Sequence, residues 1–170
     1  LGRAGAAVVL LARGEAALAD TAAWLRADGC RAAWVSADLA DRAGVERAAT
    51  AAGGPFGEPD IVVNAAGLNL RPELAALTLA DWDRLMAVNL TAPFQLGQHY
   101  GPAMAGRGWG RIINIASQQA MRAFGNSGGY GAAKGGLVSL TRSQSEAWAP
   151  RGVCCNAVAP GFVATPLTRE

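Results

Sequence analysis

The stretch GRIINIASQQAMRAFGNSGGYGAAKGGLVSL, residues 110–140, holds one strand-and-helix unit. It begins with Arg111–Ile115, a short run rich in branched apolar residues, which is typical of a strand buried in a parallel sheet. From Gly129 the residues are small and spaced as in a helix, and this segment continues to Trp148. The stretch therefore predicts a buried strand, a loop, and a helix that packs on the sheet.

The same alternation of strand and helix covers the rest of the chain. Further strands are predicted at Ala6–Ala12, Ala32–Val35, Asp60–Asn64 and Val153–Val158, and further helices at Glu15–Asp28, Asp41–Ala52 and Thr78–Ala105. Thr78 followed by Asp81 forms a capping box, and Asp41 stands at the start of another helix. The alternation predicts an α/β fold, a doubly wound parallel sheet in three layers, α/β/α.

Composition narrows the class of protein. The 170 residues carry a net charge of +2, 51% are hydrophobic and 16% are charged, which is typical of a soluble globular protein. No linker or repeat divides the chain, so residues 1–170 are interpreted as a single domain. Basic residues are scattered, which argues against nucleic-acid binding, and no apolar segment approaches the ~20 residues that span a membrane.

Cysteine and histidine usage points to a cytoplasmic protein without a metal site. Cys30, Cys154 and Cys155 form neither a paired framework nor a C-x-x-C motif, which fits a reducing compartment. His99 is the only histidine. A Ser-His-Asp triad and a multi-histidine zinc site each need an imidazole at a position matched by other partners, so both kinds of site are excluded. We interpret His99 as a surface or packing residue.

Polar and glycine residues follow each predicted strand. They are Arg13, Asp38, the segment Asn64–Gly67, Ser117 and Pro160–Gly161. Taken alone, each one is better explained as a turn, cap or loop residue. Together they lie where the carboxyl ends of parallel strands meet, which is the edge at which doubly wound sheets bind ligands.

A serine, a tyrosine and a lysine are spaced for chemistry at this edge. Ser117 precedes Tyr130 by thirteen positions, and Lys134 follows Tyr130 by four. Positions i and i+4 share one face of a helix, so Lys134 is expected to lie near the tyrosine hydroxyl and to lower its pKa. The small residues around them leave room for a bound molecule.

These residues resemble the signature of the short-chain dehydrogenase/reductase family, a serine, then Y-x-x-x-K, then P-G followed by a hydroxyl residue. In this chain the matching residues are Ser117, Tyr130, Lys134, and PGFVAT (160–165) with Thr165, together with NAAG (64–67) and Asn89 of VNLTAPF. The resemblance covers nearly the whole chain and implies a Rossmann-like fold. The family's glycine-rich phosphate loop, its first strand and its last strand have no counterpart here, so we expect a fragment of a chain of about 250 residues. Such a fragment is expected neither to fold alone nor to bind dinucleotide well.

The resemblance implies roles for individual residues. Tyr130 exchanges a proton with the substrate oxygen, Ser117 holds that oxygen, and Lys134 also binds ribose. Asn89 anchors a water chain, with stabilisation of a helix kink as its alternative role. The predicted catalytic residues are Asn89, Ser117, Tyr130 and Lys134, and the predicted substrate contacts are Ser117, Gln118, Gln119 and Tyr130. The predicted cofactor contacts are Arg13, Asp38, Leu39, Asn64, Ala65, Ala66, Gly67, Tyr130, Lys134, Pro160, Gly161, Val163 and Thr165.

The sequence narrows the cofactor to NADP or NAD and the substrate to two main classes, without deciding between them. Ala12 stands where an NAD-binding member carries an acid, and Arg13 beside it favours the 2′-phosphate of NADP over NAD. The motifs resemble both 3-oxoacyl-carrier-protein reductases and polyol or sugar-acid dehydrogenases such as gluconate 5-dehydrogenase, and the amides of Gln118 and Gln119 favour a hydroxylated small molecule. A non-catalytic dinucleotide-binding module and a sugar-nucleotide epimerase are the remaining alternatives.

The resemblance also implies an assembly. Helices 78–105 and 129–148 are expected to pair with their copies across a two-fold axis, which gives a homodimer or homotetramer. Apolar side chains of both helices are expected on the paired face, with coverage of their own sheet as the alternative. They are Trp82, Leu85, Met86, Phe94, Leu96 and Trp148.

Overall fold

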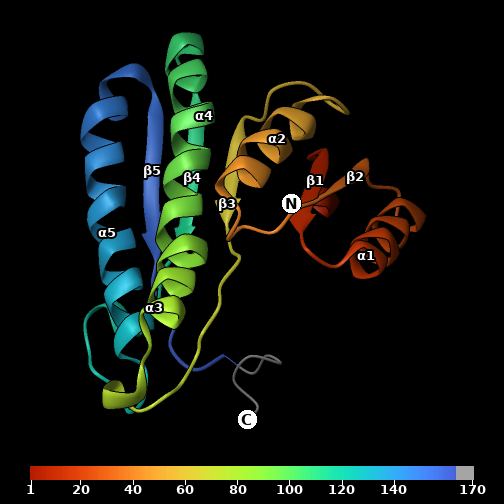
Figure 1. Ribbon diagram of the computed structural model, residues 1–170. Helices are drawn as coiled ribbons and strands as arrows, with labels where there is room; N and C mark the ends of the chain where they lie inside the picture. The colour runs from red at the N-terminus through yellow and green to blue at the C-terminus, as the bar shows by residue number, and fades with distance from the viewer. Residues whose placement is uncertain (164–170) are drawn as a thin grey trace. The chain divides into compact units, whose positions relative to one another are not determined.

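The computed structural model describes residues 1–163, which form two compact units, unit 1 (Leu1–Pro59) and unit 2 (Asp60–Glu170, described to residue 163) (Figure 1). Each unit contains its own parallel sheet. The sheet of unit 1 has the order β1-β2 and that of unit 2 has the order β3-β4-β5. The two units are described separately below.

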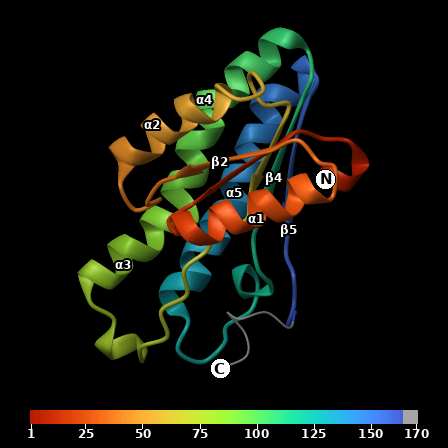
Figure 2. The ribbon, with the colours of Figure 1, turned by 90° about the vertical axis from the view of Figure 1, so that its right-hand side faces the viewer.

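Unit 1 is a two-stranded parallel sheet between two helices. β1 (Val8–Ala12) pairs with β2 (Ala32–Ser36) over the full length of both strands. Helices α1 (Glu15–Ala27) and α2 (Arg42–Gly53) lie on opposite faces of this sheet (Figures 1 and 2). The Asp41 carboxylate accepts a hydrogen bond from the Ala43 N–H at 3.0 Å, as predicted for the start of α2. Unit 1 therefore shows the predicted three layers.

Unit 2 is a three-stranded parallel sheet with its helices on one face (Figures 1 and 2). Its elements are β3 (Ile61–Asn64), α3 (Leu79–Met86), α4 (Ala92–Arg107), β4 (Gly110–Ile115), α5 (Gly128–Trp148) and β5 (Val153–Val158). In β3 the side chains of Val62 and Asn64 are buried, whereas those of Ile61 and Val63 are exposed. The buried alternate residues face the helices, because successive side chains of a strand point to opposite faces.

The predicted fold class is confirmed. Within residues 1–163 the five strands form parallel pairs with helices between them. Apart from an interruption of the helix predicted over Thr78–Ala105, the predicted ends lie within two residues of the observed ones. Strand pairing among the described residues joins β1 to β2 in unit 1, and β3 to β4 and β4 to β5 in unit 2. The assignment of residues 1–170 to one domain stays a prediction.

The predicted helix over Thr78–Ala105 is interrupted. α3 ends at Met86, a π-helical turn covers Ala87–Thr91, and α4 continues to Arg107. Asn89 lies in this turn and is fully buried. Its Nδ2 donates to the carbonyl oxygen of Leu85 at 3.0 Å, which satisfies backbone where the regular hydrogen-bond ladder is broken.

Helix α5 buries one continuous stripe of side chains. Besides Gly129 and Ala133, the buried residues recur at helical spacing and are Tyr130, Lys134, Leu137, Thr141, Gln144 and Trp148. Trp148 is only 6% exposed, so its predicted position on an outward, pairing face is wrong. It packs instead on α4, where Gly97 and Gly101 leave space for the indole ring. Close approach of the two helices depends on this pair of glycines.

Gly101→Ala is expected to destabilise the protein. A Cβ at this position would lie 2.5 Å from the Trp148 ring, so either the indole or α4 must move. We expect the free energy of unfolding of the full-length protein to fall by about 1–3 kcal/mol, measured by chemical denaturation. Gly106→Ala is the control, because a Cβ there meets open space and the change should stabilise α4 by about 0.5–1 kcal/mol. Equal stabilities of the two variants would contradict this packing.

Candidate active site

Three predicted catalytic residues come together where β4 ends and α5 begins. Ser117 follows β4 by two positions, and Tyr130 and Lys134 lie in the first two turns of α5. The side chains of Ser117 and Tyr130 share a hydrogen bond. The Lys134 Nζ lies 5.6 Å from the centre of the Tyr130 ring and donates to the Ile115 carbonyl oxygen at 2.7 Å. A hydroxyl pair and an ammonium therefore share one small region of unit 2.

Burial controls the ionisation of this group. Tyr130 is 8% exposed and Lys134 is 3% exposed. Burial raises the pKa of Tyr130, and the hydrogen bond from Ser117 offsets part of that rise. Burial also lowers the pKa of Lys134 to about 8. The predicted lowering of the Tyr130 pKa by Lys134 is therefore wrong for this structure, because desolvation by burial is the larger effect and the part that lowers the pKa comes from Ser117, not from Lys134.

Asn89 connects the π-helical turn to the loop that follows β3. Its Nδ2 donates to the Leu68 carbonyl oxygen at 2.8 Å, and its Oδ1 accepts from the Leu68 N–H at 3.3 Å. A Cβ at the neighbouring Gly67 would lie 3.3 Å from the Asn89 Oδ1 and 3.9 Å from the Lys134 Nζ. The loop thus passes close to Lys134, and a side chain at Gly67 would crowd the Asn89 amide. The kink-stabilising role is present, and the role of Asn89 in a water chain stays a prediction.

The NAAG segment divides into a buried and an open part. Asn64 is 7% exposed, and its Nδ2 donates to the Asn114 Oδ1 at 2.7 Å. This side chain is therefore engaged inside the unit. Ala65, Ala66 and Gly67 are exposed, which leaves their backbone open to a ligand.

The end of β5 lies against the loop that carries Ser117. The Gln118 N–H donates to the Pro160 carbonyl oxygen at 3.0 Å, and a Cβ at Gly161 would lie 3.8 Å from the Gln118 Oε1. The Gln119 N–H donates to the Ser117 Oγ at 3.2 Å. Predicted substrate and cofactor contacts are thus neighbours here. Val163 is exposed, and Thr165 lies outside the described residues.

One amide of this loop carries an unused acceptor. The Gln119 Oε1 is buried and has no hydrogen-bond partner among residues 1–163. A buried acceptor of this kind is costly unless a donor reaches it. A donor that reaches the Gln119 side chain would satisfy this acceptor.

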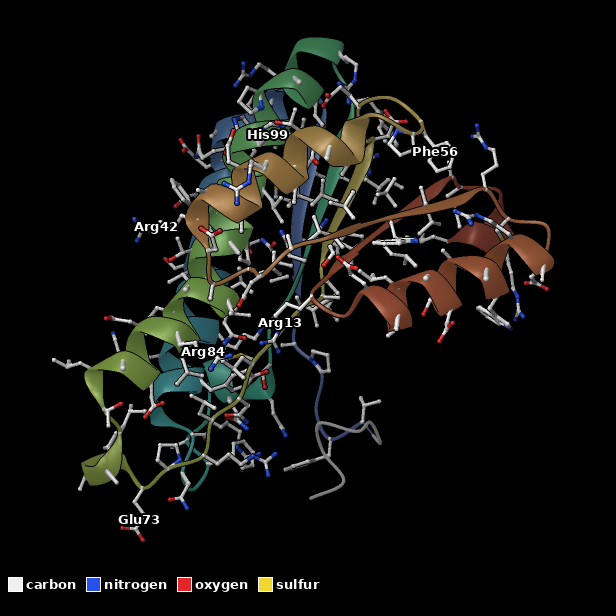
Figure 3. All side chains as sticks on the ribbon, turned by 45° about the vertical axis from the view of Figure 1, so that its right-hand side comes forward. Arg13, Arg42, Phe56, Glu73, Arg84 and His99 are labelled. Atoms are coloured by element: carbon white, nitrogen blue, oxygen red, sulfur yellow. The ribbon has the colours of Figure 1, made fainter. Side chains whose placement is uncertain are left out.

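The cofactor contacts predicted in unit 1 follow its two strands. Arg13 is exposed directly after β1, where its carbonyl oxygen accepts from the Ser36 hydroxyl at 3.1 Å (Figure 3). The Asp38 carboxylate accepts from the Ala40 N–H at 2.9 Å, so Asp38 also has the turn role considered from the sequence. Leu39 is half-buried. A pocket of about 300 Å³, lined in part by Asp38, lies between the end of β2 and α2.

The residues of unit 2 fit the ribose of a dinucleotide. An ammonium has three donors, and within the described residues one of them is used, by the Ile115 carbonyl oxygen. The remaining donors of Lys134 suit adjacent ribose hydroxyls, and the missing side chain of Gly67 leaves space beside them. Among residues 1–163 no three His, Cys, Asp or Glu side chains cluster as metal ligands. No helix in that range has the length and apolar composition that a membrane crossing requires.

Sequence reasoning missed a buried polar group beneath the site. Asn114 of β4 is fully buried and donates to Thr141 and Gln144 of α5 at 2.8 and 3.2 Å. A signal was available, because Asn114 interrupts an otherwise apolar strand, and a buried amide requires partners.

Comparison with known proteins shows the family to which the chain is similar. The profile of the protein family described as short chain dehydrogenase matches residues 1–170. A short-chain reductase from Streptomyces niveus, NovJ, is 38% identical over 168 residues, which are 98% of this chain and 63% of that protein. Gluconate 5-dehydrogenase from Gluconobacter oxydans is 35% identical over 170 residues, 100% of this chain and 66% of that protein. The chain thus spans slightly less than two thirds of the length of these relatives.

A solved structure shows the same likeness. The crystal structure of a gluconate 5-dehydrogenase from Burkholderia cenocepacia, in complex with NADP and tartrate, superimposes with a TM-score of 0.92. Its sequence is 38% identical, and the match covers 99% of this chain and 66% of that one.

Proposed function

The chain belongs to the short-chain dehydrogenase family, and we propose that the protein containing it transfers a hydride between NADP(H) and a carbonyl or secondary alcohol. The observation that carries this proposal is the hydrogen-bonded pair Ser117 and Tyr130 with the Lys134 ammonium beside it. A module that only binds dinucleotide has no need of a proton donor at this place.

Each residue of the group has a task in the reduction. Tyr130 holds its proton at neutral pH, since its pKa is raised, and gives that proton to the carbonyl oxygen as the C–O bond becomes single. Ser117 orients the carbonyl oxygen through its hydroxyl. Lys134 binds ribose and stabilises the tyrosinate that remains. When bound, the reduced nicotinamide supplies the hydride that adds to the carbonyl carbon.

We propose a small hydroxylated substrate, such as a polyol, a sugar acid or a diol. The unused acceptor on Gln119 supports this class, because a ligand hydroxyl would satisfy it, whereas an alkyl chain would leave it unpaired. The likeness to gluconate 5-dehydrogenases from two organisms points the same way. Reduction of 3-oxoacyl thioesters is the alternative within the family.

A substrate panel tests the proposed function. The full-length protein is mixed with NADPH or NADH and with ketones, keto sugar acids or 3-oxoacyl thioesters, and in reverse with NADP or NAD and polyols, while nicotinamide absorbance is followed. Turnover of keto sugar acids or polyols is expected. Preference for acyl thioesters would favour the alternative substrate, and cofactor binding without any turnover would favour a non-catalytic module.

Arg13 is expected to set the cofactor preference. Its exposed guanidinium can form a bidentate, charge-assisted contact with a 2′-phosphate, which a 2′-hydroxyl does not match. Ala12→Asp with Arg13→Ala should therefore shift the ratio of kcat/KM for NADPH over NADH by about 100-fold toward NADH. Arg31→Ala, a change of an exposed arginine that lies over Phe56, is the control and should leave this ratio unchanged. A wild-type protein that already prefers NADH would contradict the role of Arg13.

We also infer a cytoplasmic homodimer or homotetramer paired through α4 and α5. Phe94 of α4 is 44% exposed, which supports an apolar contact surface. The surface is smaller than expected from the sequence, since Leu85, Leu96 and Trp148 are all buried within their own unit. Light scattering on the full-length protein checks the pairing, and a monomer at micromolar concentration would contradict it.

A further inference from the structure

A buried hydrogen-bond network joins β3, β4 and α5 beneath the candidate active site. The Asn114 Oδ1 accepts from the Asn64 Nδ2 at 2.7 Å. The Asn114 Nδ2 donates to the Thr141 Oγ1 at 2.8 Å and to the Gln144 Oε1 at 3.2 Å. All four side chains are buried. Both donors of the Asn114 amide and its acceptor are thus in use, which defines the orientation of the amide.

The two hydrogen bonds of the Thr141 hydroxyl also have defined donors and acceptors. The Thr141 hydroxyl donates to the Leu137 carbonyl oxygen at 2.7 Å, so it can only accept from Asn114. The Gln144 Nε2 is buried and has no hydrogen-bond partner among residues 1–163, so the directional bonds of the network are the three made by the Asn114 side chain. These three bonds favour one rotation of the helix against the strand. Apolar contacts, which have no direction, would permit several.

The first half of α5 is otherwise positioned by close apolar contacts, since a Cβ added at Gly128, Gly129 or Gly136 would lie within 3.0 Å of Leu74, Leu85 or Leu90. Residues 128–136 are mostly glycine and alanine, which offer few side chains to interlock with the sheet. The Lys134 Nζ bonds the Ile115 carbonyl oxygen, and Ile115 directly follows Asn114 along β4. Thr141 lies about two helical turns beyond Lys134 on the same buried stripe.

We propose that Asn114 and Thr141 are positioning residues, which set where the Lys134 ammonium and the Tyr130 hydroxyl stand relative to Ser117. They touch neither the substrate nor the cofactor. They act through the rotation and depth of α5 on β4. The inference rests on the proposed function for its effect on turnover, while its effect on Lys134 can be measured without turnover.

The test compares Thr141→Val with Thr141→Ser in the full-length protein. Valine keeps the shape of threonine and removes the hydroxyl, whereas serine keeps the hydroxyl. The pKa of the Lys134 side chain is followed by NMR with isotope-labelled lysine, and Lys134→Arg identifies its resonance. Lys134 is the only lysine among these 170 residues, so few signals compete. The pH dependence of kcat is measured on the same variants.

Thr141→Val is expected to move the Lys134 pKa and the matching limb of the kcat profile by about half a pH unit or more. It should lower kcat roughly five- to tenfold, the change that corresponds to one lost hydrogen bond. Thr141→Ser should retain wild-type values for all three quantities. A Thr141→Val protein that only melts earlier, with the Lys134 pKa and the kcat profile unchanged, would overturn the proposal.

A second variant keeps the test decisive if Thr141→Val does not fold. Gln144→Met retains the length of the side chain and removes one acceptor of Asn114, and the same displacement of the Lys134 pKa is expected. An unchanged pKa in that variant also overturns the proposal. If the wild-type protein turns over no substrate of the panel while the valine and serine variants still differ in the Lys134 pKa, the proposed function fails and the positioning role stands.

Discussion

Tyr130→Phe is expected to abolish most turnover of the full-length protein while cofactor binding is retained. The change removes one hydroxyl, and with it the proton that the substrate oxygen must receive as hydride arrives. The ring stays in its buried position in α5, so the geometry around Lys134 is preserved. Loss of a positioned general acid lowers kcat by about 100- to 10,000-fold. Steady-state kinetics and a fluorescence titration with NADPH measure the two quantities.

Tyr100→Phe is the matched control. Tyr100 is the other tyrosine of the chain, is 4% exposed in α4, and packs its ring edge-on to His99 at 4.8 Å. The same hydroxyl is removed and the ring packing is kept, so kcat should remain within about threefold of wild type. If Tyr130→Phe retained near-normal kcat, another group would have to supply the proton, and the assignment of Tyr130 would be wrong.

The strands and most helices could be predicted because their residues are contiguous. A run such as Arg111–Ile115 is recognisable as a buried strand without knowledge of its neighbours, and Thr78 and Asp41 mark the starts of helices with their own side chains. The π-helical turn at Ala87–Thr91 could not be found in this way. One inserted residue hardly changes the periodicity of a long helix, and only the buried contacts of Asn89 explain it.

The components of the site were easier to predict than their electrostatics. Spacing placed Tyr130 and Lys134 on one face of α5, but the sign of the Tyr130 pKa shift depends on how much water remains around both groups. Desolvation comes from the packing of α5 on β5 and on the turn Gln118–Ala120, which involves residues distant in sequence. The inward position of Trp148 was predictable, because it continues the helical stripe through Lys134 and Thr141.

The fully buried Asn114 shows a second limit of sequence reasoning. An amide inside an apolar strand indicates that hydrogen-bond partners must exist, but the sequence does not identify the elements that provide them. In this protein the partners come from β3 and α5. Gly67 lies in the loop directly after β3, and Lys134 lies in α5. Polar interruptions of predicted buried strands are therefore useful markers for residues that support a site.

Lys134→Met should impair two functions at once. Methionine has similar length and no charge, so the hydrogen bond to the Ile115 carbonyl oxygen and the donors for ribose are both lost. We expect NADPH to bind about tenfold or more weakly, because hydrogen bonds from charged groups contribute about 1.5–3 kcal/mol. We expect kcat to fall by about 100-fold, since tyrosinate loses its neighbouring charge. A variant with unchanged affinity for NADPH would contradict the ribose-binding role.

The same variant tests the burial of Lys134 without any substrate. The pKa of Lys134 is about 8 in the folded protein and returns toward 10.5 on unfolding. Between these two values the unfolded chain binds more protons than the folded one, so the free energy of unfolding of the wild type gains with rising pH. The gain is about 1.4 kcal/mol for each unit by which the pKa is lowered.

Lys134→Met lacks this contribution. Between pH 8 and 10.5 the free energy of unfolding of the wild type should therefore rise relative to that of the variant. Chemical denaturation of both proteins at a series of pH values measures it. Parallel curves would show that Lys134 is solvated in the folded protein. The conclusion that burial lowers its pKa would then be wrong.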